Sequence, residues 1–257
     1  MLDKDSLLAA SHYEQPYQKE KDYIEEIFLA GIFGRFDNLV FKGGTALSKF
    51  YDSIRFSDDL DFSLVEKRES KKVGTTLEKM IEAFSDYPIE VMRKRDTPDK
   101  TLYELSIRGP LFEMLDKYQH LKIEIDKNAP VIETTNTFRK NPVYNDIGPY
   151  IAVVMSPKEI LAEKTEALMF RHNLKARDLY DLYFLLQKGT EIKVSLIDRK
   201  MREHGSTFTT ERFMERMEAM AGIWETELRR LLPEDKFVLY DTVKKSVIDG
   251  FKASSIL

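Results

Sequence analysis

Hydrophobic and polar positions change their period several times along the first 155 residues. In 20–34 apolar side chains recur every three or four residues, which predicts an amphipathic helix. From Asp59 the period becomes two, and Leu60, Phe62 and Leu64 alternate with polar residues as in a half-buried strand. Other short apolar or alternating stretches predict further strands at 39–41, 88–95, 102–109, 121–126 and 150–154, and a helical period predicts helices at 45–51 and 71–84.

The pattern changes in the second part of the chain. Residues 127–149 are rich in Asn, Pro and Thr, and we predict a loop there. Ser156-Pro157-Lys158-Glu159 has the residues of a capping box with proline at the first helical position, so it predicts a helix start. The residues that follow have a helical pattern. The sequence therefore predicts an α+β fold, with a mixed sheet flanked by helices in 1–155 and a helical half in 156–257.

A glycine pair, Gly43 and Gly44, stands between a predicted strand and a predicted helix. Backbone N–H groups at such a turn can approach an anion closely, and the helix dipole attracts it. Thr45 and Ser48 could add hydroxyl groups to the same phosphate. The alternative is a tight turn with a structural role only, since the stretch is not a G-x-x-x-x-G-K-[ST] loop.

Clustered carboxylates follow the glycine pair. Asp59 and Asp61 are two residues apart on a predicted strand, so both side chains share one face, with Cα atoms about 6–7 Å apart. Like charges so placed repel each other unless a cation lies between them, and Mg²⁺ binds carboxylate and phosphate oxygens together. The alternative is that both face water at a strand end. Asp58 lies on the other face, whereas Glu124 and Asp126 share a strand face and either could supply a third carboxylate.

Two charged residues in the second half stand on apolar helix faces. Lys164 has an apolar residue four positions before it and four positions after it, and so has Asp178. An unpaired buried charge is costly, so each needs a partner or a function. One explanation is a Lys164–Asp178 ion pair between antiparallel helices. The other is that Lys164 contacts nucleotide phosphates, while Asp178 or Asp181 orients the substrate or acts as a base.

Two blocks of the sequence resemble the AbiEii/AbiGii-type nucleotidyltransferase toxins, a branch of the DNA polymerase β-like nucleotidyltransferase superfamily. The first block is Gly43-Gly44-Thr45-x-Leu47 followed by Arg55-x-Ser57-x-Asp59-x-Asp61. The second is the helical lysine Lys164 followed by Arg177-Asp178-x-x-Asp181-Leu182, which is similar to the R-D-x-x-D-L motif of that family. The resemblance extends over about residues 20–187.

The resemblance implies a nucleotidyltransferase-like fold, with the nucleotide site in a domain 1–155 and a helical domain 156–257 that completes the active-site cleft. The implied reaction moves NMP from an NTP substrate to an acceptor, with Mg²⁺ (or Mn²⁺) as cofactor and pyrophosphate as leaving group. The implied catalytic residues are Asp59, Asp61, Lys164, Asp178 and Asp181. The implied nucleotide-binding residues are Gly43, Gly44, Thr45, Ser48, Ser57 and Lys164, and the implied metal ligands are Asp59, Asp61 and either Glu124 or Asp126.

The resemblance also implies a biological role. Such a protein would be the toxin of a bacterial toxin–antitoxin or phage-defence pair, with a cognate antitoxin encoded nearby and tRNA or another RNA as acceptor. Two alternatives fit the same motifs. One is a small-molecule nucleotidyltransferase of the antibiotic-modifying type, and the other is a non-catalytic nucleotide-binding regulatory module.

The amino-acid composition narrows the kinds of protein and of functional site that are possible. The 257 residues are 33% charged and 42% hydrophobic, as in ordinary globular proteins. A net charge of −4 argues against a protein that depends on non-specific nucleic-acid binding, and it gives tRNA binding no support. The absence of cysteine excludes disulfides, thiolate catalysis and Cys-based zinc sites, and the four histidines lack metal-ligand spacing. No stretch is apolar over 18 residues and no signal-peptide pattern is present, so we expect a cytoplasmic protein without a membrane segment.

Overall fold

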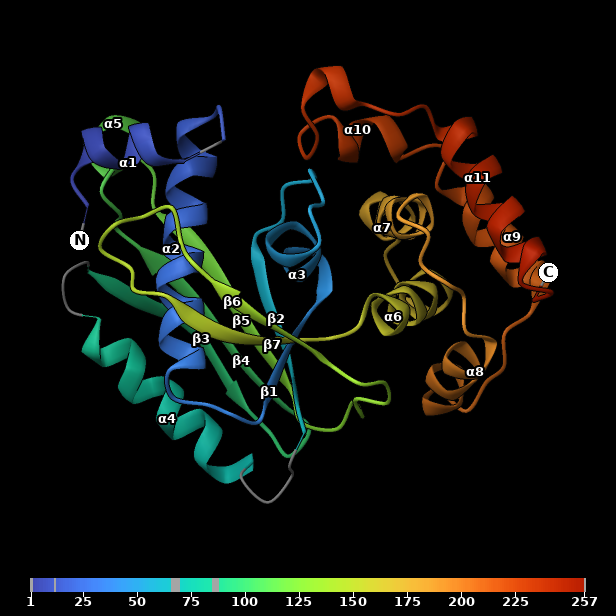
Figure 1. The fold of residues 1–257 in the computed structure, drawn as a ribbon, viewed down its shortest axis with the longest axis horizontal. Coiled ribbons are helices and arrows are strands. Elements are labelled where there is room, and N and C mark those ends of the chain that lie inside the picture. The colour runs from blue at the N-terminus through green and yellow to red at the C-terminus, as the bar shows by residue number, and fades with distance from the viewer. Residues whose placement is uncertain (1, 12, 66–69, 85–87, 257) are drawn as a thin grey trace. The chain divides into compact units, whose positions relative to one another are not determined.

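The computed structural model describes residues 2–11, 13–65, 70–84 and 88–256, and its internal contacts divide the chain into two compact units (Figure 1). The first unit comprises Met1–Phe50, Ser57–Val131 and Thr135–Val154, and the second comprises Tyr51–Phe56, Ile132–Thr134 and Met155–Leu257. None of the described helices combines the length and the apolar character needed to span a bilayer.

The first unit is built on a mixed seven-stranded sheet with the strand order β3-β4-β5-β2-β1-β7-β6. The neighbours β2 and β5 run parallel, as do β1 and β7, whereas the other neighbouring pairs are antiparallel. The strands are β1 (Leu39–Lys42), β2 (Asp59–Leu64), β3 (Ile89–Asp96), β4 (Lys100–Ile107), β5 (Gln119–Asp126), β6 (Asn136–Lys140) and β7 (Tyr150–Val154). The predicted mixed sheet is confirmed.

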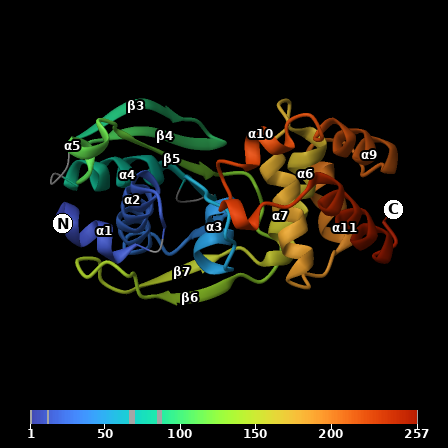
Figure 2. The same ribbon diagram turned by 90° about the horizontal axis from the view of Figure 1, so that it is seen from above.

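Helix α2 (Pro16–Phe33) is the central helix of the first unit. It packs against both β5 and β7, and Figure 2 shows it between the β3–β5 strands and the β7–β6 strands, so the sheet curls around it. The apolar side of the alternation in β2, Leu60 and Phe62, is fully buried. Burying such a side chain contributes about 1.5–3 kcal/mol, which fixes the opposite face for the aspartates. The other helices of this unit are α1 (Lys4–Ala10), α3 (Gly43–Phe50), α4 (Ser70–Ala83) and α5 (Phe112–Leu115).

The second unit is helical, which confirms the predicted helical half. Its helices are α6 (Pro157–Phe170), α7 (Ala176–Gln187), α8 (Val194–Glu203), α9 (Thr210–Ala219), α10 (Trp224–Leu228), the 3-10 helix η2 (Glu234–Lys236) and α11 (Tyr240–Ala253). At the start of α6 the Ser156 hydroxyl accepts a hydrogen bond from the Glu159 N–H at 3.2 Å, as the capping box predicts. The Glu159 carboxylate accepts hydrogen bonds from the Ile132 and Glu133 N–H groups. These bonds tie residues 132–134 to the helical unit.

One prediction about the first unit is wrong. The stretch 127–149, predicted as a loop, contains the edge strand β6, which pairs antiparallel with β7. Its sequence, Asn136-Thr137-Phe138-Arg139-Lys140, is mostly polar, and none of its residues is buried. An edge strand with little buried surface needs no alternation of apolar residues, so hydrophobic periodicity does not reveal it.

Candidate active site

The glycine turn lies directly against one of the predicted metal ligands. Lys42, the last residue of β1, is paired with Asp61 of β2, and α3 begins at the next residue, Gly43. Gly43 has φ +79°, and a Cβ atom built on it would lie only 2.8 Å from Asp61 Oδ2. A side chain here would therefore be strained and would also displace the carboxylate. Gly44, in the first turn of α3, is buried. The turn and the carboxylate pair thus form one local structure.

Asp59 and Asp61 share the face of β2 that is opposite its apolar side chains. Burial and the negative charge of Asp59 raise the pKa of Asp61 to about 6, and Glu124 adds to this effect, while Lys122 and Lys42 oppose it. Two carboxylates that hinder each other's ionisation are relieved by a cation, and their hard oxygen atoms suit Mg²⁺ or Mn²⁺.

The two candidates for a third carboxylate differ in their surroundings. In the parallel pairing of β2 with β5, Glu124 is opposite Asp61, whereas Asp126 is opposite Ser63. Asp126 Oδ1 accepts hydrogen bonds from the Asn128 and Ala129 N–H groups, both at 2.9 Å, so it shapes the turn after β5.

Glu124 is held by two lysines. Its Oε1 accepts a hydrogen bond from Lys100 Nζ at 2.6 Å, and its Oε2 lies 2.9 Å from Lys122 Nζ. Burial alone would raise the pKa of Glu124, but the two lysines lower it overall. Among the described residues, no three carboxylate or imidazole groups converge closely enough to hold a metal ion. The oxygen atoms of Asp59 and Asp61 are a donor pair that fits such a cation. Glu124 could join them only if the cation displaced one of its two lysine partners.

The hydroxyl groups of the first motif connect α3 to the start of β2. Thr45 is buried, and its Oγ1 donates to the Asp59 carbonyl at 2.6 Å and lies 2.9 Å from Ser57 Oγ. Ser57 is buried as well. Ser48 donates to the Thr45 carbonyl at 3.1 Å and lines a cavity of about 90 Å³. Thr45 and Ser57 thus hold the glycine turn beside Asp59.

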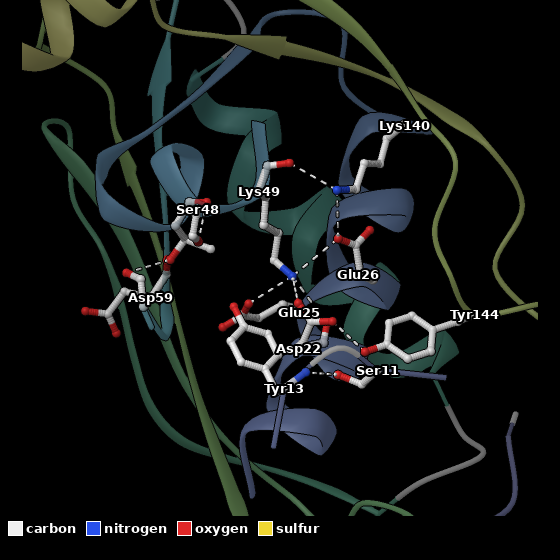
Figure 3. A network of polar contacts seen from close by, with 12 residues as sticks. Ser11, Tyr13, Asp22, Glu25, Glu26, Ser48, Lys49, Asp59, Lys140 and Tyr144 are labelled. Carbon is white, nitrogen blue, oxygen red and sulfur yellow. Dashed lines mark hydrogen bonds and ion pairs between the residues drawn. The ribbon is translucent and has the colours of Figure 1, made fainter. Parts of the chain in front are cut away.

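A buried lysine that the sequence analysis missed anchors α3. Lys49 Nζ lies 2.7 Å from Asp22, 3.1 Å from Glu25 and 3.3 Å from Glu26, three carboxylates of α2 (Figure 3). Burial would lower the pKa of Lys49, but these charges raise it well above its usual value. Lys140 Nζ donates to the Lys49 carbonyl at 3.0 Å, at the end of the helix. The network fixes the helix whose first residues form the glycine turn.

The second motif forms an ion-pair network within the helical unit. Lys164 on α6 lies 3.1 Å from Asp178 and 2.8 Å from Asp181, both on α7. The predicted Lys164–Asp178 ion pair is therefore present. Arg55, which precedes Ser57 in the first motif, donates to both oxygens of Asp181, at 2.9 and 3.0 Å. Arg171 Nη1 lies 3.3 Å from Asp178 Oδ2.

The two aspartates of this network are not equivalent. Arg55 and Asp181 have side chains only 1% and 0% exposed, and Arg55 and Lys164 hold the pKa of Asp181 below its usual value although burial opposes this. Asp181 uses both oxygens in this pairing. Asp178 Oδ2, by contrast, is buried and accepts no hydrogen bond, although it lies near Arg171. The sequence analysis did not assign Arg55 a role, and its only signal was its place in the Arg-x-Ser-x-Asp-x-Asp motif.

Comparison with known proteins gives a family and a fold. Residues 27–240 match the family model described as "Nucleotidyl transferase AbiEii toxin, Type IV TA system". None of the curated proteins matches the chain. Similar solved structures include MenT4, the nucleotidyltransferase toxin Rv2826c from Mycobacterium tuberculosis H37Rv, with 21% identity, 100% of this chain and 91% of that chain covered, and a TM-score of 0.68.

Two further solved structures come from Helicobacter pylori. A putative nucleotidyltransferase has 18% identity, 95% and 96% of the two chains covered and a TM-score of 0.61. The protein JHP933 has 19% identity, 94% and 93% covered and a TM-score of 0.59. At these identities the similarity supports the shared fold.

Proposed function

This chain belongs to the AbiEii nucleotidyltransferase toxin family, and we propose that it transfers NMP from NTP to an acceptor in a reaction that depends on Mg²⁺ or Mn²⁺. The observation that carries this proposal is the close approach of the Gly43 backbone to the Asp61 side chain, which lies next to Asp59 on the same strand face. It joins a backbone turn suited to phosphate with a carboxylate pair suited to a divalent cation.

In this proposal Asp59, Asp61 and Glu124 would hold the cation, which when bound would neutralise charge on the triphosphate and on the leaving pyrophosphate. The N–H groups at Gly43 and Gly44 bind phosphate oxygens at the start of α3, where the helix dipole is favourable. An acceptor hydroxyl attacks the α-phosphorus and passes its proton to Asp178 or to solvent, while the bond between the α-phosphorus and pyrophosphate breaks and pyrophosphate leaves. Positioning and charge neutralisation account for catalysis, without a covalent intermediate.

For the helical unit, we assign Lys164 to the triphosphate charge and Asp178 to orienting or deprotonating the acceptor hydroxyl. The Asp178 oxygen that accepts no hydrogen bond supports its choice over Asp181, which we assign to positioning because Arg55 and Lys164 already bind both of its oxygens. Thr45, Ser48 and Ser57 remain predicted nucleotide-binding residues.

The type IV toxin family supports an antitoxin partner, and we propose that this antitoxin is encoded nearby. We further propose tRNA or another RNA as the acceptor, which rests on the family resemblance alone. Small-molecule acceptors are the contrasting outcome of the experiment.

The test is an acceptor screen with purified protein, Mg²⁺ and each of the four α-labelled NTPs. Total RNA, tRNA and aminoglycosides are offered separately, and both labelled acceptor and pyrophosphate are measured. Asp59→Asn and Asp61→Asn should each lower the rate by at least about 100-fold, because charge neutralisation at the reacting phosphate is lost. Asp58→Asn is the matched control, because Asp58 precedes β2, and this variant should stay active.

The screen also separates the alternatives. NTP binding that survives Asp61→Asn and yields no pyrophosphate would favour a regulatory module. Label on an aminoglycoside but not on RNA would favour a small-molecule enzyme. Full activity in both aspartate variants would contradict the proposed metal site.

A further inference from the structure

Charges alternate in sign along a row of paired residues that crosses the sheet to the carboxylate pair. Asp59 of β2 is opposite Lys122 of β5, which is opposite Glu104 of β4, which is opposite Arg93 of β3. Cross-strand neighbours on one face have Cβ atoms about 5 Å apart, so opposite charges in such a row stabilise each other. Lys122 therefore has an acidic neighbour on each side within this row.

Lys122 is also tied to the next row of the same face. Its Nζ lies 2.9 Å from Glu124 Oε2, and Glu124 is in turn opposite Asp61. Burial alone would lower the pKa of Lys122, but the hydrogen bond to Glu124 and the charges of Asp61, Glu124 and Asp59 raise it overall. The Lys122 ammonium group thus binds Glu124 directly, and Lys122 is the cross-strand partner of Asp59.

The positive charge of Lys122 offsets negative charge of these carboxylates, as a bound cation would otherwise do. The Lys122 side chain is 34% exposed, and its ammonium group stands at the end of a flexible stem. The ammonium group can therefore leave Glu124 without unfolding the strand. Lys100 contacts the other oxygen of Glu124. It is opposite Asp126, which lies one residue pair further from Asp61 than Glu124 does. Lys122 is the lysine that a cation at Asp59 and Asp61 would repel.

We propose that Lys122 is a further residue of the nucleotide site: it compensates Asp59, Asp61 and Glu124 when no metal is bound, and it contacts substrate phosphate when the metal takes its place. The inference rests on the proposed function, because it requires a cation at these carboxylates. It predicts opposite effects on two ligands when Lys122 is neutralised. Metal alone should bind more tightly, since a competing positive charge is gone. Nucleotide with metal should bind more weakly, since a phosphate contact is gone.

The experiment measures Mn²⁺ binding alone, by calorimetry and by electron paramagnetic resonance, and then the binding of a non-hydrolysable NTP analogue at saturating Mn²⁺. Lys122→Met should tighten Mn²⁺ binding about tenfold and weaken analogue binding about tenfold. Lys122→Arg, which keeps the charge, should bind Mn²⁺ as the unmodified protein does. Lys94→Met is the matched control, because Lys94 is on the same sheet but pairs with Glu78 at 2.8 Å, and neither affinity should change.

The outcomes separate this inference from the function on which it rests. If the unmodified protein binds Mn²⁺ no better than Asp59→Asn does, the metal site itself is refuted. If Mn²⁺ binding depends on Asp59 but Lys122→Met leaves both affinities unchanged, or weakens both, the role of Lys122 is refuted. Thermal denaturation verifies that each variant is folded, and Lys122→Gln replaces Lys122→Met if that variant does not fold.

Discussion

Replacing Gly43 by alanine tests how closely the glycine turn controls Asp61. Two effects are expected from the structure. A residue with a Cβ at φ +79° is strained by about 1–2 kcal/mol, which should lower the free energy of unfolding by that amount. The new methyl group would also lie 2.8 Å from Asp61 Oδ2, a distance that real Cβ contacts do not show. Because the carboxylate stands at the end of a side chain, we expect it to move aside while the strand remains folded.

The displaced carboxylate should affect the reaction more than the stability. A misplacement of about 1 Å at a reacting centre lowers rates about 100-fold, so we expect that loss in NMP transfer, with weakened Mn²⁺ binding. Gly189→Ala is the control for strain alone, since Gly189 has φ +76° and no atom within 4 Å of its added Cβ. Urea denaturation and the transfer assay are measured on both variants. If both lose stability equally and both stay active, the contact does not position Asp61.

Three further predictions concern stability, each measured by urea denaturation. Arg55→Met should cost about 3–5 kcal/mol, because the buried Asp181 carboxylate loses its bidentate partner; a change below 1 kcal/mol would contradict this. Burial raises the pKa of Glu25 from 4.5 to about 7, so folding opposes its ionisation and stability should fall by about 3 kcal/mol between pH 4.5 and pH 7. Glu25→Gln should remove the contribution of Glu25 to this dependence, while the contribution from the raised pKa of Asp61 remains. A pH profile identical to that of the unmodified protein would refute the assignment. Thr45→Val should cost about 1–3 kcal/mol by leaving the Asp59 carbonyl without its hydroxyl donor, whereas Thr45→Ser should remain close to the unmodified protein.

The sequence predicts well what local patterns determine. Alternation from Asp59 to Leu64 predicts the strand and the shared face of Asp59 and Asp61, because the period of two is a property of a single strand. The glycine pair predicts a turn before α3. That this turn meets Asp61 depends on the pairing of β1 with β2, which no local pattern contains.

Contacts between distant residues explain what the sequence analysis missed. Lys49 is charged, so it is expected at the surface, and only its three partners on α2 explain its burial. Arg55 and Asp181 are 126 positions apart in the chain. Our proposal of Glu124 over Asp126 likewise rests on strand register and on a turn, since both residues share one face in the sequence pattern.

The segment Tyr51–Phe56 has a consequence for dissecting this protein into fragments. It belongs to the helical unit, although α3 and β2 on either side of it belong to the sheet. Arg55 pairs with Asp181, the Phe56 N–H donates to the Leu231 carbonyl at 2.8 Å, and the Tyr51 hydroxyl donates to the Met155 carbonyl at 2.8 Å.

A fragment that ends near residue 155 would therefore expose an arginine and a backbone donor whose partners it lacks. The remaining helical fragment would lack the guanidinium partner of Asp181. Neither piece is expected to be a self-sufficient folding unit, so inactivating truncations, split reporters and exchanges between relatives should use the whole chain as the module.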